Sequence, residues 1–83
     1  MAYFVYMIVS KINCKLISYV GYTNNLEKRV KLHNLSKGAK FTKGKKWQLV
    51  YYRKFNNKTS AMKYEYLLKN DKKKRNKIKS NYL

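Results

Sequence analysis

The sequence predicts an α+β fold in which helices flank a three-stranded, mainly antiparallel β-sheet. Two segments rich in aromatic and β-branched residues come first, and a third such segment follows near the middle of the chain. Elsewhere apolar residues recur at helical spacing, which gives the order β-β-α-β-α-α. Eighty-three residues suffice for one compact domain, so residues 1–83 are expected to form a single domain.

The strands are expected at residues 3–9, 16–22 and 47–55. The first is a continuous apolar run, which suits a strand buried on both faces. The polar residues 11–15 join it to the second as a hairpin connection, with Asn13 as a turn residue. The third alternates apolar and more polar side chains, as a strand with one buried face does.

Three helices complete the expected order. Leu26, Val30 and His33 recur at helical spacing, and Asn24 is expected to cap this helix with Glu27 three residues later, as in a capping box. Residues 34–46, which carry five lysines, form a basic loop. A second helix is expected over residues 60–69. A third, very basic helix is expected from a cap at Asp71 to about residue 81.

Charge is the strongest functional signal. Lys and Arg number 21 against three Asp and Glu, a net charge of +18. Solubility needs roughly 2 to 8 charges in a small domain, so a polyanion is expected to balance the excess, and nucleic acid is the natural one. A merely cationic surface is the plain alternative. A membrane-surface peptide is disfavoured, because the apolar residues do not form one amphipathic stripe.

The single cysteine, Cys14, excludes an internal disulfide and a Cys-rich zinc site. No apolar run approaches the roughly 18 residues of a membrane span. The apolar segment near the N-terminus lacks a preceding positive region, so we expect an intracellular protein and no membrane partner.

Glu65 is the acidic residue without an obvious structural role. Glu27 and Asp71 can both serve at helix starts, whereas Glu65 lies in mid-helix on a face shared with small and apolar residues. Mg²⁺ needs only one or two carboxylates beside water and phosphate oxygens, so a lone Glu could hold it. The alternative is a surface ion pair with Lys69 one helical turn away.

Four further side chains are candidates for chemistry. Arg29 and His33 lie four residues apart on one helix face, where they could clamp a phosphate and relay a proton. Tyr6 and Tyr19 lie on neighbouring strands, and a phenol near a cation can lose its proton. The plain alternatives are a solvated Arg beside a half-buried His, and two core tyrosines. Gly21 at a strand end permits close approach of a phosphate, or is a simple turn residue.

Together these residues resemble the GIY-YIG nuclease domain. Residues 4–6, Phe-Val-Tyr, stand where the family has Gly-Ile-Tyr, and residues 19–21, Tyr-Val-Gly, where it has Tyr-Ile-Gly. Further residues follow in the family's order: Thr23, Leu26, Arg29, His33 and Glu65. The stretch Gly-Ala-Lys-Phe-Thr at residues 38–42 is similar to the small stand-alone bacterial branch, which is itself similar to the catalytic domain of eukaryotic structure-specific GIY-YIG endonucleases. The resemblance spans nearly the whole chain.

The resemblance implies a divalent-metal-dependent endonuclease that hydrolyses phosphodiester bonds in DNA and is structure-selective or sequence-nonspecific. Glu65 would hold one Mg²⁺ or Mn²⁺ ion, and Arg29 would stabilise charge on the phosphate. Tyr6 would activate the attacking water and pass its proton through His33. A role in DNA repair or recombination would follow.

The same resemblance implies the contacts to the nucleic acid. Tyr19 would orient water or phosphate, and Gly21 would leave room for the scissile strand. Four loop lysines would contact flanking phosphates: Lys40, Lys43, Lys45 and Lys46. Branched or single-stranded DNA is the expected partner and RNA stays open, whereas the sequence identifies no protein partner.

Three departures from the family pattern stand out. Phe4 replaces the first glycine of the first motif, the segment between the two tyrosine motifs is slightly long, and the family's late Asn has two candidates here, Asn76 and Asn81. Two other functions also remain open. A non-catalytic basic module that binds nucleic acid would need the same charge, and so would a structural protein of a ribonucleoprotein particle.

Overall fold

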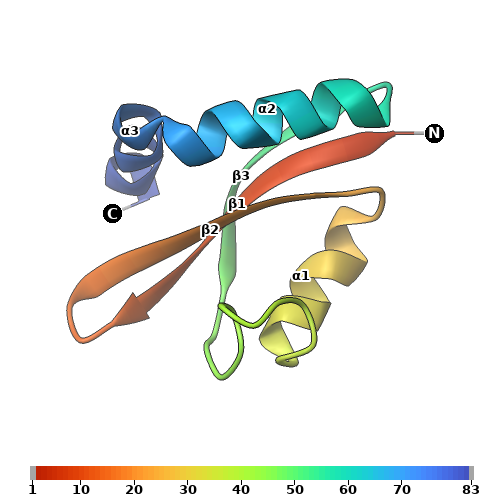
Figure 1. The fold of residues 1–83 in the computed structure, drawn as a ribbon. Coiled ribbons are helices and arrows are strands. Elements are labelled where there is room, and N and C mark those ends of the chain that lie inside the picture. The colour runs from red at the N-terminus through yellow and green to blue at the C-terminus, as the bar shows by residue number, and fades with distance from the viewer. Residues whose placement is uncertain (1, 83) are drawn as a thin grey trace.

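The expected element order and fold class are confirmed by a computed structural model, which describes residues 2–82. Along the chain lie β1 (Tyr3–Ile12), β2 (Lys15–Thr23), α1 (Leu26–Asn34), β3 (Gln48–Phe55), α2 (Lys58–Asn70) and α3 (Lys72–Tyr82). The strands form one sheet in the order β2-β1-β3, and both pairings are antiparallel (Figure 1). In residues 2–82 every helix is too short or too polar to cross a bilayer.

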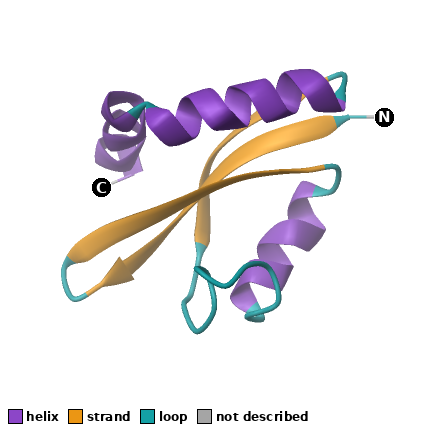
Figure 2. Ribbon diagram, in the orientation of Figure 1, coloured by secondary structure: helices purple, strands orange, loops and turns teal. Residues whose placement is uncertain are grey.

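The central strand β1 is buried on both faces, as its unbroken apolar sequence predicts. Its side chains alternate between two hydrophobic clusters. One contains Val5, Met7 and Val9 with Ala61 and Leu68 of α2, and the other contains Tyr6 and Ile8 with Trp47. Figure 2 shows the corresponding layers, with α2 on one side of the sheet and α1 with its following loop on the other.

The hairpin between β1 and β2 is tighter than the sequence suggested. Pairing continues through Lys11↔Leu16 and Ile12↔Lys15, so the connection is two residues rather than five. Both connecting residues have positive φ, 48° at Asn13 and 69° at Cys14. This matches the two-residue type I′ turn, whose twist suits antiparallel strands. Polar side chains had marked residues 11–15 as a loop, but backbone pairing does not depend on their polarity.

The cap of α1 is one residue away from the predicted one. Asn25, not Asn24, accepts the Lys28 amide on its side-chain oxygen at 3.1 Å. The capping box expected between Asn24 and Glu27 is therefore wrong. The hydroxyl of Thr23 accepts the Asn25 amide at 3.1 Å and fixes the chain just before the helix, which selects the second of two consecutive asparagines.

The other two helices start at asparagine and aspartate caps. Asn57 accepts the Ser60 amide at 2.8 Å, so α2 begins two residues earlier than expected. The predicted cap of α3 is confirmed, because Asp71 accepts the Lys74 amide at 3.0 Å.

Strand β3 pairs with only part of β1. A bulge interrupts the register, with Met7 opposite Tyr51 and Ile8 opposite Leu49, and pairing stops at Val9↔Gln48. Trp47, expected to start this strand, lies just outside it. The last residues of β1 therefore have β2 as a neighbour on one edge and no strand on the other.

Candidate active site

A pocket of about 450 Å³ opens at the edge strand β2, between α1 and α2. Four of the five predicted catalytic residues line it: Tyr6, Tyr19, Arg29 and Glu65. The fifth, His33, is fully buried and in contact with the hydroxyl of Tyr6. Six other residues complete the lining: Tyr3, Gly21, Tyr22, Thr23, Asn24 and Lys58.

The sheet register puts the two tyrosines on one face. Tyr6 of β1 lies opposite Gly21 of β2, and Tyr19, two residues before Gly21, lies opposite Ile8. Because side chains alternate along a strand, Tyr6 and Tyr19 point to the same side of the sheet, toward α1. Arg29 and His33 are four residues apart on α1, and their side chains reach this face of the sheet.

Glu65 reaches the pocket from the other face of the sheet. It belongs to α2, which packs against β1 and β2 on the side opposite α1. The sheet ends at β2, so the Glu65 side chain meets the pocket around that edge. Its side chain is 18% exposed, and its carboxylate lies 3.5 Å from the Lys69 ammonium. Glu65 thus both forms the surface ion pair with Lys69 and lines the pocket.

A continuous chain of hydrogen bonds runs through the buried side of the site. Thr42 donates its hydroxyl proton to the Ala39 carbonyl at 3.0 Å, so its oxygen accepts from Nδ1 of His33 at 2.8 Å. With Nδ1 carrying the proton, Nε2 of His33 accepts from the hydroxyl of Tyr6 at 2.6 Å. The Nε group of Arg29 in turn donates to the Tyr6 oxygen over a longer 3.5 Å.

The electrostatics favour this arrangement of protons. Burial, and after it the Arg29 guanidinium, lower the pKa of His33 below its usual 6.5, so the imidazole is a neutral acceptor at neutral pH. Burial raises the pKa of Tyr6, while Arg29 opposes that rise. The phenol therefore keeps its proton in the resting protein and points it at a base.

Two glycines make room for this chain. A side chain on Gly21 would place its first carbon 2.6 Å from the Tyr6 hydroxyl, too close for any real contact. Likewise, a carbon added at Gly38 would run into the His33 imidazole ring. Gly21 was expected to leave room for the nucleic acid. The structure gives it a second role, which is to accommodate the Tyr6 hydroxyl within the sheet.

Sequence reasoning missed the contribution of the loop behind the site. Thr42 is fully buried and orients His33, and Gly38 allows the imidazole to fit. Asn34 ties the same loop down, because its side-chain oxygen accepts the Trp47 amide at 2.6 Å and its amide donates to the Trp47 carbonyl at 3.1 Å. The segment at residues 38–42 was noticed only as part of the family resemblance, which is the one signal that could have found them.

Several predicted residues lie away from the pocket. Lys40 and Lys43 are exposed on the loop, whereas Lys45 and Lys46 line a different cavity near the hairpin tip. The two candidates for the late Asn, Asn76 and Asn81, are exposed on α3, and neither is among the residues that line the pocket.

Comparison with known proteins decides the family. The model of the GIY-YIG catalytic domain matches residues 2–79, nearly the entire chain. The chain belongs to the GIY-YIG family. It is thus a domain of a nuclease family, whose members act on nucleic acid and generally use divalent metal ions.

Several relatives of this GIY-YIG domain are bacterial proteins of the UPF0213 group. The chain is 50% identical over 52 residues to the UPF0213 protein OB0043 of Oceanobacillus iheyensis, a match that covers 61% of this chain and 60% of that one. It is 43% identical over 68 residues to the UPF0213 protein SH2523 of Staphylococcus haemolyticus, covering 81% and 79%.

A solved relative has the same fold. The solution NMR structure of the UPF0213 protein BH0048 from Bacillus halodurans superposes with a TM-score of 0.51 at 34% identity, covering 96% of this chain and 84% of that one. These relatives support the assignment of the chain to the small bacterial branch that the sequence resembles. Their names state no activity.

The buried neutral state of His33 predicts how stability depends on pH. Because the folded-state pKa lies below the usual 6.5, the folded protein binds fewer protons than the unfolded chain as pH falls through this range. The stabilisation that His33 contributes is complete above pH 6.5 and is lost as the pH falls toward the folded-state pKa of His33. Urea unfolding of the wild type should show a falling free energy of unfolding below pH 6.5. The same slope in His33→Gln, which removes the only histidine, would contradict this assignment.

Proposed function

We propose that this GIY-YIG domain is an endonuclease that hydrolyses phosphodiester bonds in DNA with one Mg²⁺ or Mn²⁺ ion. The supporting observation is the hydrogen-bonded chain from Arg29 through Tyr6 and His33 to Thr42, which meets a pocket that also contains Glu65. A phenol held between a guanidinium and a neutral imidazole is placed to lose its proton, and a carboxylate at the same pocket can hold a cation.

The donor set of the pocket fits a magnesium-like ion. No group of three or more His, Cys, Asp or Glu gathers anywhere in residues 2–82, which excludes a closed cage built from such side chains there. Mg²⁺ does not need one, because it keeps several waters and takes one or two carboxylates together with substrate oxygens. Glu65 would hold it, and the ion when bound would supply positive charge to the scissile phosphate and the attacking water.

The chain's own residues have distinct roles in the proposed reaction. Tyr6 takes a proton from the attacking water as its own proton moves to Nε2 of His33, and Thr42 keeps the imidazole in the required tautomer. Arg29 faces the negative charge that builds on the phosphate, and Tyr19 orients the phosphate or the water. Because Tyr6 is buried, the water must reach its hydroxyl from the pocket that Tyr6 lines.

The net charge of +18 supports sequence-tolerant binding to the phosphate backbone. We infer that the substrate is DNA with a branched or single-stranded region, and that the domain acts in repair or recombination. The test is a cleavage assay on duplex, nicked, branched and single-stranded DNA and on RNA, each with Mg²⁺, with Mn²⁺ and with a chelator. Metal-dependent cutting of the DNA structures is expected. Preferential cutting of RNA would contradict the substrate assignment.

A non-catalytic module that binds nucleic acid is the second candidate. It is favoured by the contact of Glu65 with Lys69, because this ammonium already neutralises the carboxylate that would hold the ion. Under this alternative the wild type binds all of the substrates above with a steep salt dependence and cuts none of them.

Arg29→Ala separates the two candidates by comparing rate with affinity. Many lysines share the binding energy, whereas one guanidinium is proposed to meet the transition-state charge, so cleavage should slow by on the order of 10²–10³ while the Kd changes little. Single-turnover rates and Kd values would be measured for Arg29→Ala and for Lys28→Ala, an exposed neighbour on α1. Equal losses of rate and affinity in Arg29→Ala would make Arg29 an ordinary phosphate contact.

A further inference from the structure

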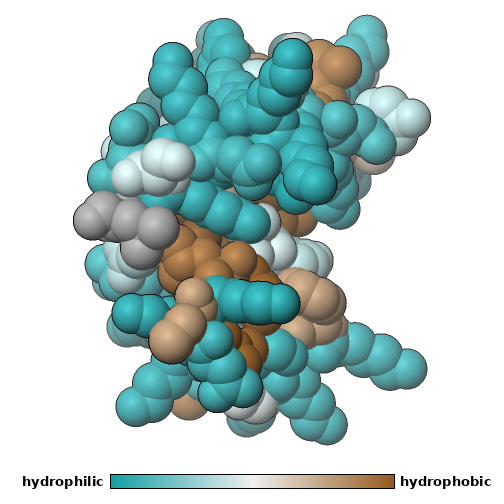
Figure 3. Space-filling view, turned by 90° about the vertical axis from the view of Figure 1, so that its left-hand side faces the viewer, coloured by the Kyte–Doolittle hydropathy of each residue, from teal (hydrophilic) through white to brown (hydrophobic). Residues whose placement is uncertain are grey.

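A second, larger cavity is lined by residues of the β1–β2 hairpin, by residues 44–48 and by Tyr82 of α3. Its volume is about 590 Å³, compared with about 450 Å³ for the proposed catalytic pocket. Figure 3 looks onto the side of the molecule where this hairpin lies and shows apolar surface in a hollow between two blocks of hydrophilic side chains. The catalytic pocket and this cavity have no lining residue in common.

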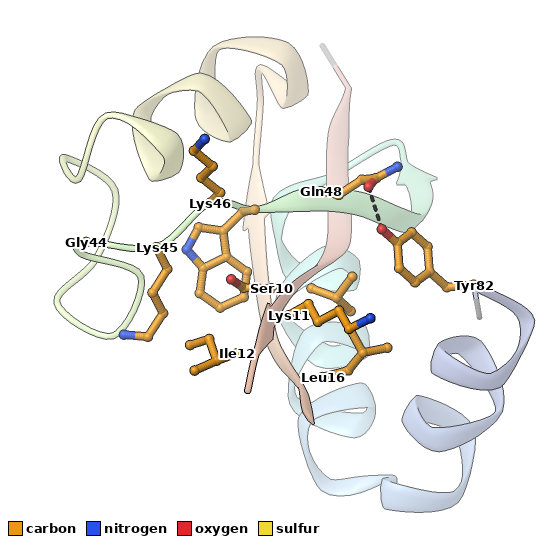
Figure 4. Close-up of a pocket in the computed structure, with 11 residues that line it drawn as sticks. Ser10, Lys11, Ile12, Leu16, Gly44, Lys45, Lys46, Gln48 and Tyr82 are labelled. Atoms are coloured by element: carbon orange, nitrogen blue, oxygen red, sulfur yellow. Dashed lines mark hydrogen bonds between the residues drawn. The ribbon is translucent and has the colours of Figure 1, made fainter. Parts of the chain in front are cut away.

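The cavity exists because β3 leaves β1 early. After Val9↔Gln48 the outer edge of β1 has no strand partner, so the backbone of residues 10–12 faces the cavity instead of a neighbouring strand. The opposite wall comes from Gly44 to Gln48, and Tyr82 closes one side with a 2.5 Å hydrogen bond from its hydroxyl to the Gln48 side chain (Figure 4). Free backbone donors and acceptors are therefore available to a ligand.

The lining combines cations with flat and apolar surface. Lys11, Lys45 and Lys46 belong to the lining, and Figure 4 shows Ser10 and Ile12 between Lys45 and Lys11, with the exposed Lys46 side chain extending away from them. Ile12 is 38% exposed and Tyr82 is 41% exposed. None of the described residues that line the cavity is acidic. Positive charge beside apolar surface, with polar groups and no carboxylate, suits a ligand that carries both phosphates and bases.

The position of the cavity relates it to the catalytic pocket. Both contain residues of β1, with Tyr6 at one and Lys11 at the other, but the catalytic pocket opens at the β2 edge of the sheet and the cavity faces the edge of β1 that β3 leaves. Five residues of an antiparallel strand span roughly 17 Å at about 3.4 Å each. A nucleic acid in contact with both sites would have to pass around the sheet.

We propose that this cavity is a second nucleic-acid subsite, which holds a strand of the substrate away from the scissile phosphate. Lys11 and Lys46 contact its phosphates, and Ile12 and Tyr82 offer apolar surface to its bases. This inference rests on the proposed function for its ligand, nucleic acid, but it does not require that the bond be cut.

Trp47 provides a built-in reporter. It is the only tryptophan in the chain, it lines the cavity, and it is 5% exposed. The experiment titrates the whole protein with duplex and branched DNA in a chelator and follows Trp47 fluorescence at several salt concentrations. Lys11→Glu and Lys46→Glu are compared with Lys63→Glu, which makes the same charge change at an exposed position on the outer side of α2.

DNA should change the Trp47 emission of the wild type and of Lys63→Glu. Lys11→Glu and Lys46→Glu should bind more weakly, and the slope of log affinity against log salt should become shallower by about one relative to Lys63→Glu. Equal slopes in all three variants would overturn the subsite, as would DNA binding that leaves Trp47 unchanged. Saturation by a nucleoside monophosphate at lower concentrations than DNA would overturn the assignment to a strand. Because no step depends on cutting, a wild type that binds as described but never cleaves refutes the proposed function alone.

Discussion

Glu65→Gln should reduce cleavage below detection while nucleic-acid binding persists or tightens. The substitution keeps the size of the side chain and its helix propensity, but it removes the charge that is proposed to hold the divalent ion. Binding should not suffer, because a negative charge near the phosphates has gone and Lys69, 3.5 Å away, is released from its ion pair. The cleavage rate should therefore fall while the affinity for nucleic acid stays the same or rises.

Stability provides a check on this result. The pair with Lys69 is partly exposed, with the lysine side chain 47% exposed, so its loss should change the free energy of unfolding by less than about 1 kcal/mol. Glu27→Gln is the matched control, because it removes the same charge from an exposed position in the first turn of α1. If Glu65→Gln cuts as fast as Glu27→Gln, Glu65 does not hold the ion and only the surface ion pair remains.

Tyr6→Phe should slow cleavage by roughly 10²–10⁴, the usual contribution of a positioned acid or base. The substitution removes one oxygen atom and leaves the ring that packs with Ile8 and Trp47. It breaks the 2.6 Å hydrogen bond to His33 and the longer one from Arg29, so the proposed proton path is interrupted. Affinity should be nearly unchanged, since Tyr6 is buried and the binding charge is carried by lysines.

The control for this change is Tyr66→Phe, because Tyr66 is 69% exposed on α2 and outside the proposed catalytic pocket. Circular dichroism and urea unfolding would establish that both variants are folded. A folded Tyr6→Phe that retains the rate of Tyr66→Phe would show that the hydroxyl is a structural group, and the role of base would then belong elsewhere.

The sequence was sufficient to predict which residues lie on the sheet face of the site, because side-chain directions repeat regularly along strands and helices. Alternation along β1 and β2 places Tyr6 and Tyr19 on one face, and a separation of four residues places Arg29 and His33 on one side of α1. These positions depend on local geometry that residue spacing encodes.

Other parts of the site depend on how the chain packs in three dimensions. Glu65 meets the pocket because β2 is the sheet edge and α2 lies close to it, which spacing along α2 does not reveal. Thr42 meets His33 through the path of an irregular loop. The same loop carries Lys45 and Lys46 to the hairpin end, so four lysines predicted to act together are divided between two regions.

The most direct test of the central claim is a nicking assay on branched DNA in Mn²⁺ and in a chelator. Wild type, Tyr6→Phe and Glu65→Gln would be compared at protein concentrations that saturate binding in all three. We predict nicking by the wild type in Mn²⁺ alone, with both variants bound to the DNA yet strongly impaired. A wild type that binds but does not nick, or variants that nick at its rate, would contradict the assignment of metal-dependent cleavage to this pocket.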